Sequence, residues 1–455
     1  MSHDARRRFQ GLFVLSILAL VAFALGPSRA EANPVDDWNG IANQVIVVNA
    51  NRAGLSNIDF AYVFIAIYDA VNAIDGGHSV FAVKPTTSPA GASPDAATAA
   101  AAYNVLKWLF PTQQPYLDGA YAGYLFGIPN GPAKTRGIAV GSEVAAKFIA
   151  LRTGDGRNAV VPYVLRSGPG EYQLTPETGT VYNPPGVPVG TWVPGLKTFA
   201  IESATQFRAD GPPHLTSARY ARGLNETKAY GALTGSLRSA KQTEIGNFYA
   251  ENPGQQINRN VRNIAAAHSL SFVDSARFFA QIYVTMADAQ ITTWNSKYFY
   301  NFWRPVTAIR AADTDDNPAT EADPSWLPLV RPTPGHPEYP AAHPTVTGSL
   351  ADTLAQFFGT EKLDVTLTST SVTPGTLVAH QFTNTDDIVK DVINGRIYGG
   401  MHYRFSGEAG AEIARKVTKY VARHYFRAVK DHDDEEDNDK DSDDHSRRRD
   451  DDDDR

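Results

Sequence analysis

The chain has 455 residues, no cysteine and a formal net charge of −7. Because cysteine is absent, disulfide bonds and catalytic thiolates are excluded. Stability must come from a large core, and the roughly 400 residues between the two terminal segments suffice to form one. No basic patch or aromatic platform favours nucleic-acid binding.

The N-terminus has the pattern of a secretory signal peptide. Arg6-Arg7-Arg8 precede an apolar run from Leu12 to Leu25, which is followed by small residues near Ala30 and Ala32. We expect residues 1–32 to be removed, with cleavage after Ala30 or Ala32. The apolar run is too short for a membrane span, so we expect a secreted or periplasmic protein without one. The arginines also resemble a twin-arginine signal, although an ordinary basic segment explains them equally.

Most of the chain between the two ends is predicted to be helical. Ser93 is a suitable N-cap for a helix that begins at Pro94, and long apolar stretches with few breakers favour buried helices over strands. Strand-like alternation is scarce, so we predict an all-α helical bundle domain over residues 33–430. The expected helical segments are 58–71, 94 onward, 133–151, 217–233, 274–300, 345–358 and 406–429.

Residues 163–196 depart from the helical pattern. Pro, Gly, Tyr and Thr dominate this stretch without a sustained period. Long loops inside compact proteins are usually functional, so we expect a lid or a rim segment here.

The C-terminal residues 431–455 form an acidic tail. They contain fifteen Asp or Glu residues against five Lys or Arg residues, so the rest of the chain has a net charge of +3. A segment with dense like charge and almost no apolar residues is predicted to be disordered. We interpret it as a solubilising tail, with loose binding of Ca²⁺ or mineral as the alternative.

Three short stretches in the last third of the chain carry the residues for oxyanion chemistry. They are Lys297 with Arg304-Pro305, then Pro340-Ala-Ala-His343, then Arg396 with His402. Arginine forks and a lysine point charge can neutralise a tetrahedral anion from several sides, and two imidazoles can attack or ligate its central atom and move protons. Seven positions separate Lys297 from Arg304, which would place both on one face of a helix. Gly399-Gly400 suggest a helix end before His402.

Each stretch alone has an ordinary structural explanation. The Lys-to-Arg spacing is usually a solvated helix face, His343 could be a surface or capped residue, and His402 could be a satisfied core histidine. Taken together and in order, the three favour an oxyanion site.

The three stretches resemble the signature shared by vanadium-dependent haloperoxidases and acid phosphatases of the phosphatidic acid phosphatase type 2 superfamily. This resemblance implies two related four-helix bundles packed into one domain. It also implies a vanadate cofactor, with hydrogen peroxide, a halide and a small organic acceptor as reactants. The sequence leaves the number of subunits open.

The resemblance implies a role for each matching residue. His402 would be the metal ligand, and His343 would be the acid–base residue. The oxyanion would be bound by side chains and one backbone amide, namely Lys297, Arg304, Arg396 and the N–H of Ala342.

Two further positions resemble the haloperoxidases more than the phosphatases. Trp294 precedes Lys297 by one helical turn and would lie beside the halide, although ordinary core packing explains it equally well. His336 precedes His343 by seven residues, and a histidine there resembles the bromide- and iodide-using members, although a loop histidine without a role is equally compatible. Its charged form would attract halide. Bromide and iodide are easier to oxidise than chloride, and together with this resemblance that leads us to expect bromide and iodide oxidation with little on chloride.

The chain also departs from the usual family pattern. Ala341 and Ala342 replace the usual Ser-Gly before His343, so one hydroxyl bond to the anion is lost, at a cost of about 1.5–3 kcal/mol. Gly395 replaces the usual Ser before Arg396. Ser406 replaces the usual Asp four residues after His402, which leaves the orientation of that ligand without its usual support.

The sequence therefore allows three functions. The favoured one is a secreted vanadate-dependent haloperoxidase that oxidises bromide or iodide to hypohalous acid. A secreted acid phosphatase could use the same residues, with His402 as nucleophile. A non-catalytic anion-binding relative is the third, given the lost Ser and Asp.

Overall fold

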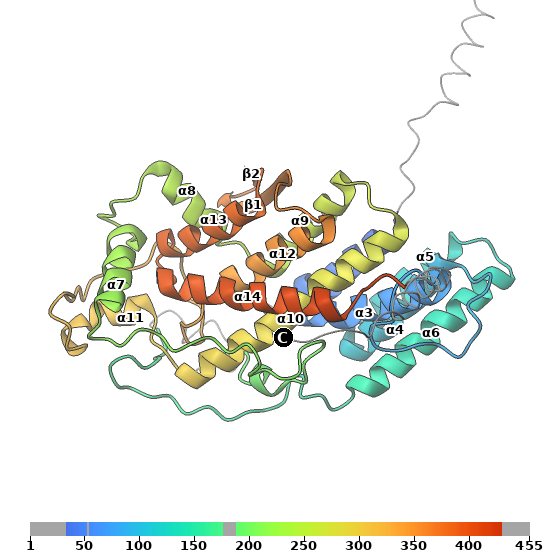
Figure 1. The fold of residues 1–455 in the computed structure, drawn as a ribbon, viewed down its shortest axis with the longest axis horizontal. Helices are drawn as coiled ribbons and strands as arrows, with labels where there is room; N and C mark the ends of the chain where they lie inside the picture. The colour runs from blue at the N-terminus through green and yellow to red at the C-terminus, as the bar shows by residue number, and fades with distance from the viewer. Residues whose placement is uncertain (1–32, 52–53, 176–187, 430–455) are drawn as a thin grey trace, which may run out of the picture.

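The computed structural model describes residues 33–51, 54–175 and 188–429. The expected signal peptide (1–32) and acidic tail (431–455) lie outside the described residues. The described part is mostly helical, with one two-stranded hairpin (Figure 1), which confirms the predicted helical-bundle class.

The elements follow one another along the chain with short 3₁₀ and π segments between some of them. Their bounds are α2 Pro34–Asn43, the π-helix Gln44–Asn49, α3 Ser56–Asp75, α4 Pro94–Leu109, the 3₁₀ turn Pro111–Gln113, α5 Gln114–Phe126, α6 Pro132–Arg152, the 3₁₀ turn Val193–Gly195, α7 Ala218–Gly231, α8 Ala240–Phe248, α9 Pro253–Ala267, α10 Phe272–Tyr300, α11 Pro305–Arg310, the 3₁₀ turn Ala312–Thr314, α12 Ala342–Phe358, β1 Val365–Thr373, β2 Thr376–Phe382, α13 Thr385–Tyr398 and α14 Arg404–His424.

The N-terminal helices α3, α4 and α6 pack against one another. Ser93 caps α4 by accepting a hydrogen bond from the Ala96 amide, as predicted. On α6, a Cβ atom at Gly141 would lie 2.1 Å from the carbonyl oxygen of Ala97. Glycine is therefore required for α4 and α6 to approach this closely.

Helix α10 joins the two halves of the molecule. It packs against α3 on the N-terminal side and against α12 and α14 on the C-terminal side. Figure 1 shows it running between the blue and cyan N-terminal helices and the orange and red C-terminal ones. The helix begins after the N-cap Ser271 and ends where Asn301 adopts a left-handed conformation. Residues near its C-terminal end thus lie beside the C-terminal helices.

Most predicted helices are present, with small errors at their ends. The predicted segment 217–233 corresponds to α7, which stops at Gly231. The segment 406–429 corresponds to α14, which starts earlier and ends at His424. The prediction that Lys297 and Arg304 share one helix was wrong, because α10 ends at Tyr300 and Arg304 is the N-cap of α11.

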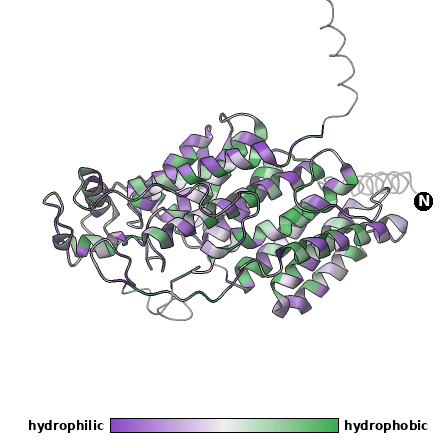
Figure 2. Ribbon diagram, turned by 60° about the horizontal axis from the view of Figure 1, so that its bottom comes forward, coloured by the Kyte–Doolittle hydropathy of each residue, from purple (hydrophilic) through white to green (hydrophobic). Residues whose placement is uncertain are grey.

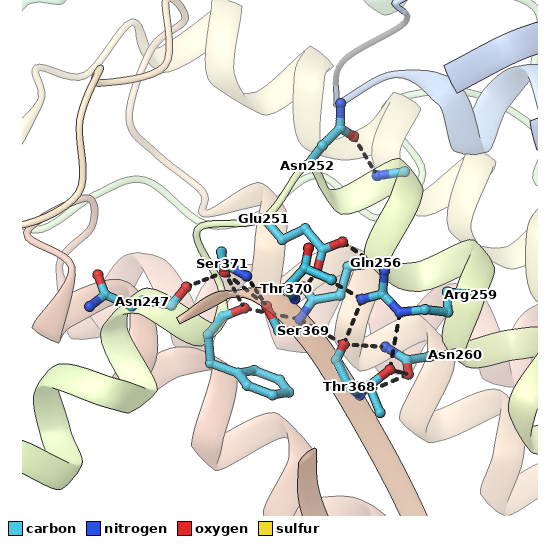
Figure 3. A network of polar contacts seen from close by, with 12 residues as sticks. Asn247, Glu251, Asn252, Gln256, Arg259, Asn260, Thr368, Ser369, Thr370 and Ser371 are labelled. Carbon is cyan, nitrogen blue, oxygen red and sulfur yellow. Dashed lines mark hydrogen bonds and ion pairs between the residues drawn. The ribbon is translucent and has the colours of Figure 1, made fainter. Parts of the chain in front are cut away.

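The hairpin β1–β2 was not predicted. Its strands pair antiparallel from Val365↔Phe382 to Thr373↔Thr376, on either side of a Pro-Gly turn. A polar network ties β1 to α9 (Figure 3): Arg259 donates to both carboxylate oxygens of Glu251 and to Thr368, and Glu251 also accepts from the Thr370 amide. The alternating residues of β1 and the Pro-Gly turn are sequence signals of a hairpin. They were overlooked because such alternation is scarce in the rest of the chain.

The buried hydrophobic residues fall into two clusters. The larger one spans the N-terminal helices, α10 and the C-terminal helices, and Figure 2 shows hydrophobic and hydrophilic residues interleaved along these helices, as amphipathic packing requires. Helix α3 has the length and hydropathy of a membrane span, but 89% of that window is buried inside the protein. It therefore serves as a core helix.

Candidate active site

The second, smaller cluster is mainly aromatic and positions the three predicted stretches. Phe302 and Trp303 precede Arg304, Tyr339 precedes Pro340, and Tyr403 and Phe405 follow His402. The Phe302 ring lies 6.0 Å from that of Tyr403 and 6.5 Å from that of Tyr339, with edge-to-face geometry. Aromatic pairs of this kind add stability beyond burial. They bring stretches that are distant in sequence to one place.

Lys297 lies fully buried near the C-terminal end of α10. Its Nζ donates to the carbonyl oxygens of Pro337 and Glu338, at 2.9 and 2.8 Å. An ammonium has three donors, so one N–H remains for a further acceptor. The lysine thus connects the first stretch to the segment just before the second.

Arg304 lies at the centre of the cluster and is fully buried. Its Nε donates to the carbonyl oxygen of His336, and its Nη2 lies 3.0 Å from Nδ1 of the same residue. Its Nη1 lies 3.2 Å from Nε2 of His402. Although Arg304 is not on the helix of Lys297, the turn at Asn301 brings it back to the same site.

The contacts of His402 fix which ring nitrogen bears the proton. Arg304 can only donate, so the Nε2 atom of His402 must accept and carry a lone pair. The proton therefore resides on Nδ1, which lies 2.8 Å from the Oε1 atom of Glu338. A histidine with an unprotonated Nε2 and an anchored Nδ1–H has the form required of a metal ligand or a nucleophile.

Arg396 lies in the last turn of α13 and is buried. Its Nη1 donates to the carbonyl oxygen of Tyr249, at 2.6 Å, whereas its Nε is buried without a partner in the described part of the chain. The chain turns at Gly399-Gly400, as predicted, with φ of 73° at Gly400. A Cβ atom on Gly400 would lie 2.7 Å from the carbonyl oxygen of Gly231, so both the conformation and the space require glycine there.

His343 lies in the first turn of α12, with Ala341 as the N-cap. Its Nε2 is buried and has no hydrogen-bond partner among the described residues. The amides of a first helical turn have no partner within the helix, and they favour an anion through the helix dipole. The Ala342 amide belongs to this turn.

Trp294 and His336 line one wall of a small cavity of about 150 Å³. Their ring centroids are 5.1 Å apart, and Trp294 also donates to the carbonyl oxygen of Val189. His343 and His402 line the same cavity, together with apolar residues that include Val346 and Pro334. Trp294 is therefore both a packed residue and a cavity wall.

Buried positive charge exceeds negative charge at the site. Burial and the neighbouring Arg304 lower the pKa of Lys297 well below its usual value and that of Arg396 to about 9. Burial raises the pKa of Glu338 to about 7, although the two nearest cations oppose this. A bound anion would favour the charged form of each cation.

Burial and the same cations lower the pKa of all three site histidines, His336, His343 and His402. In the absence of an anion His336 is therefore neutral near pH 7. A charged His336 that attracts halide, as expected from the sequence, thus requires a negative charge nearby to raise its pKa.

The predicted loop, residues 163–196, is described on both sides of residues 176–187. Both described parts attach to the C-terminal part of α10. Val189 accepts hydrogen bonds from Trp294 and from the Tyr298 hydroxyl, and the Tyr172 amide donates to the Asn301 carbonyl. Val189 also lines the cavity, as expected of a rim segment. Residues 176–187 of this loop lie outside the described residues.

The structure brings together every site residue predicted from the sequence. The predicted set is Trp294, Lys297, Arg304, His336, Ala342, His343, Arg396 and His402. Sequence analysis missed Glu338, whose carboxylate oxygen Oε1 lies 2.8 Å from Nδ1 of His402. A carboxylate between prolines in His-Pro-Glu-Tyr-Pro, next to a candidate site, was a signal that could have been followed.

Comparison with known proteins agrees with this geometry. Residues 277–431 match the family model of the VCPO second helical-bundle domain. Vanadium chloroperoxidase of Curvularia inaequalis is 31% identical over 195 residues, a match that covers 36% of this chain and 31% of that protein. The matched part thus spans about a third of the curated relative.

Solved structures extend the similarity to most of the chain. A bacterial vanadium-dependent iodoperoxidase superposes with a TM-score of 0.71 at 20% identity, over 88% of this chain and 97% of the other. A holo-type bacterial vanadium-dependent chloroperoxidase gives 0.63 at 15% identity, over 88% and 93%. This chain shares the fold of these two enzymes. The region that matches the VCPO second helical-bundle domain, residues 277–431, contains all the predicted site residues.

Proposed function

We propose that this protein is an exported vanadate-dependent haloperoxidase, which oxidises bromide or iodide with hydrogen peroxide to hypohalous acid. The observation that carries the proposal is that three buried cations, Lys297, Arg304 and Arg396, surround His402, whose unprotonated Nε2 lies 3.2 Å from Arg304. Support for export comes from the N-terminal sequence pattern.

The residues present fit a tetrahedral oxyanion such as vanadate. The Nε2 of His343 and the Nε of Arg396 are buried without partners in the described chain, and buried polar groups are rarely left so. The site has three buried cations, Lys297, Arg304 and Arg396. Among the described residues of the site, one carboxylate, that of Glu338, opposes them. An oxyanion would satisfy the unpaired atoms and neutralise the excess charge.

His402 would hold vanadate through Nε2, and Lys297, Arg304, Arg396 and the Ala342 amide would bind its oxygens. When bound, vanadate supplies a Lewis acid that activates hydrogen peroxide towards a halide. The cations are fixed in place by backbone carbonyls, so they stabilise developing negative charge without rearranging. The Nε2 of His343 can accept a proton from peroxide and return it.

The cavity wall supports a preference for bromide or iodide. Trp294 and His336 offer a polarisable face and a ring edge beside the site, and Val346 and Pro334 restrict water. A soft, weakly hydrated halide is easier to move into such a pocket than chloride is.

The size of the cavity also bears on the organic acceptor. Pockets for drug-sized ligands have volumes of about 300–1,000 Å³, whereas this cavity measures about 150 Å³. We therefore place only peroxide and halide inside. Hypohalous acid would leave the cavity and halogenate a small organic acceptor outside it.

An acid phosphatase is the second candidate, because the lone pair on His402 Nε2 would also suit attack on a phosphate ester. His343 would then protonate the leaving oxygen. A non-catalytic anion-binding role is less well supported, since Glu338 restores the carboxylate support that Ser406 lacks.

Parallel assays test the proposal. Purified protein is supplied with vanadate, peroxide and bromide or iodide, and separately with a phosphate monoester without vanadate. Halide oxidation that depends on vanadate supports the haloperoxidase. Ester hydrolysis alone would favour the phosphatase, and inactivity in both, with anion binding retained, would favour the non-catalytic relative.

A further inference from the structure

Glu338 contacts the first and the third of the three stretches and lies just before the second in sequence. Its carbonyl oxygen accepts from Lys297 Nζ at 2.8 Å, and its Oε1 atom accepts from His402 Nδ1 at 2.8 Å and from the Tyr403 amide at 3.2 Å. Its own amide donates to the Phe302 carbonyl at 2.9 Å. The residue is fully buried. Hydrogen bonds of its backbone amide and carbonyl therefore fix the residue in place, and its carboxylate is held beside the histidine.

The geometry leaves one tautomer for His402. Arg304 Nη1 lies 3.2 Å from Nε2, and a guanidinium cannot accept a hydrogen bond. The Nδ1–H form satisfies both Arg304 and Glu338, whereas the Nε2–H form would direct a proton at the guanidinium and a lone pair at the carboxylate. Without Glu338, only the contact with Arg304 would oppose the second form.

We propose that Glu338 is the positioning residue that fixes the tautomer and ring orientation of His402, so that Nε2 faces the oxyanion site. The inference rests on the proposed function only insofar as it names the purpose of that orientation. Ser406 lies four residues after His402 and cannot supply a carboxylate, so the support comes from a different segment of the chain. Partners of this kind typically change metal affinity about 10–100-fold when they are lost.

The first test is the tautomer itself, in protein without any anion. Long-range proton–nitrogen NMR spectra of histidine-labelled protein distinguish Nδ1–H from Nε2–H, and the His402 signal is assigned by its loss in His402→Gln. We expect the Nδ1–H form in the native protein and a substantial Nε2–H population in Glu338→Ala. A variant that keeps the native tautomer would overturn the proposal.

The second test is vanadate binding, measured by titration rather than by turnover. Glu338→Ala should weaken binding about 10–100-fold. Glu338→Gln retains an amide oxygen that can accept from Nδ1–H, so its loss should be smaller and its tautomer native. Equal affinity in Glu338→Ala and the native protein would contradict the proposed role.

A matched control separates positioning from general stability. Glu251 is also a buried carboxylate with a cationic partner and a backbone amide donor, but it lies outside the site. Glu251→Gln should lower the melting temperature and leave the His402 tautomer and vanadate affinity unchanged.

If Glu338→Ala does not fold, Glu338→Asp keeps the charge while withdrawing the oxygen from Nδ1, and the same tautomer shift is expected. A native tautomer in that variant would count against the proposal.

Failure of the function can be told apart from failure of this inference. If the native protein binds neither vanadate nor phosphate, the proposed function fails. The tautomer shift in Glu338→Ala would still establish the positioning role, and an unchanged tautomer would still refute it.

Discussion

Two buried polar clusters in this molecule are built from the same kinds of side chain and differ in balance. The Glu251–Arg259 network has one carboxylate and one guanidinium, and the guanidinium donates to both carboxylate oxygens and to β1 (Figure 3). The candidate active site has three cations and one carboxylate, with unpaired nitrogens on His343 and Arg396. A balanced cluster stabilises the fold, whereas an unbalanced one requires a ligand to complete it.

The largest expected effect is the loss of activity in His402→Ala. His402 has an unprotonated Nε2 beside Arg304 and an Nδ1–H held by the Glu338 carboxylate, and we expect no other described histidine to replace it as the ligand. Vanadate-dependent halide oxidation should fall to background while circular dichroism remains native. The control is His424→Ala, an exposed position on α14, which should retain full turnover. Normal vanadium content in His402→Ala would refute the ligand assignment.

Anion binding should stabilise the protein measurably. If the site lacks its counter-charge, vanadate or phosphate at about a hundred times its Kd should raise the free energy of unfolding by about 2.7 kcal/mol. Thermal or chemical unfolding with and without the anion gives this value. Arg396→Ala should lose most of the gain, and Glu251→Gln should keep it. If the native protein is equally stable with and without the anions, the candidate site does not have the excess of positive charge that distinguishes it from the Glu251–Arg259 network.

Replacing the arginine by lysine in each cluster compares them directly. Arg304→Lys keeps the charge but loses the planar fork, so oxyanion affinity should fall by about tenfold or more. Arg259→Lys breaks the paired contact with Glu251 and should cost about 1–3 kcal/mol of stability. Its oxyanion affinity should be unchanged. Equal affinities in Arg304→Lys and the native protein would place Arg304 outside the site.

His336→Phe should alter halide choice rather than overall stability. The substitution removes the imidazole beside Trp294, the feature by which the sequence resembles bromide- and iodide-using members, and we expect the ratio of bromide to chloride oxidation to fall severalfold. Initial rates with each halide at one pH measure this ratio. Strong chloride oxidation by the native protein would contradict the role assigned to His336.

The smallest effect concerns His380, which lies between two carboxylates and does not line the cavity. Burial lowers its pKa, but hydrogen bonds to Asp391 and Glu244 outweigh this and raise it. A raised folded pKa means that this stabilisation is complete below the unfolded value of about 6.5 and is lost as pH rises through the folded pKa. His380→Gln should therefore lose more stability at pH 6 than at pH 9. A loss that does not vary with pH would show that His380 is neutral in the folded state.

The sequence was most informative where chemistry and spacing coincide. Lys297, Arg304, His343, Arg396 and His402 could be predicted because charged residues and imidazoles in that order are rare by chance. The placement of Arg304 could not be predicted, because the left-handed turn at Asn301 depends on packing that spacing alone does not reveal.

Other features depend on tertiary contacts that the sequence alone does not show. Glu338 follows His336 by two residues in sequence, but its importance arises from His402, 64 residues away. The β1–β2 hairpin was missed because its threonine and serine alternation is weakly apolar, and its stability comes from Arg259 and Asn260 on α9.

The attachment of the loop to α10 has a consequence for engineering. Both described ends of residues 163–196 are fastened to the end of the helix that carries Lys297: one through Tyr172 and Asn301, the other through Val189 and Tyr298. The two anchors therefore hold the lysine end of α10 from two sides. Engineered changes near the cavity should keep Tyr172, Val189 and Tyr298 in place, because these residues hold the scaffold while the chemistry lies on other side chains.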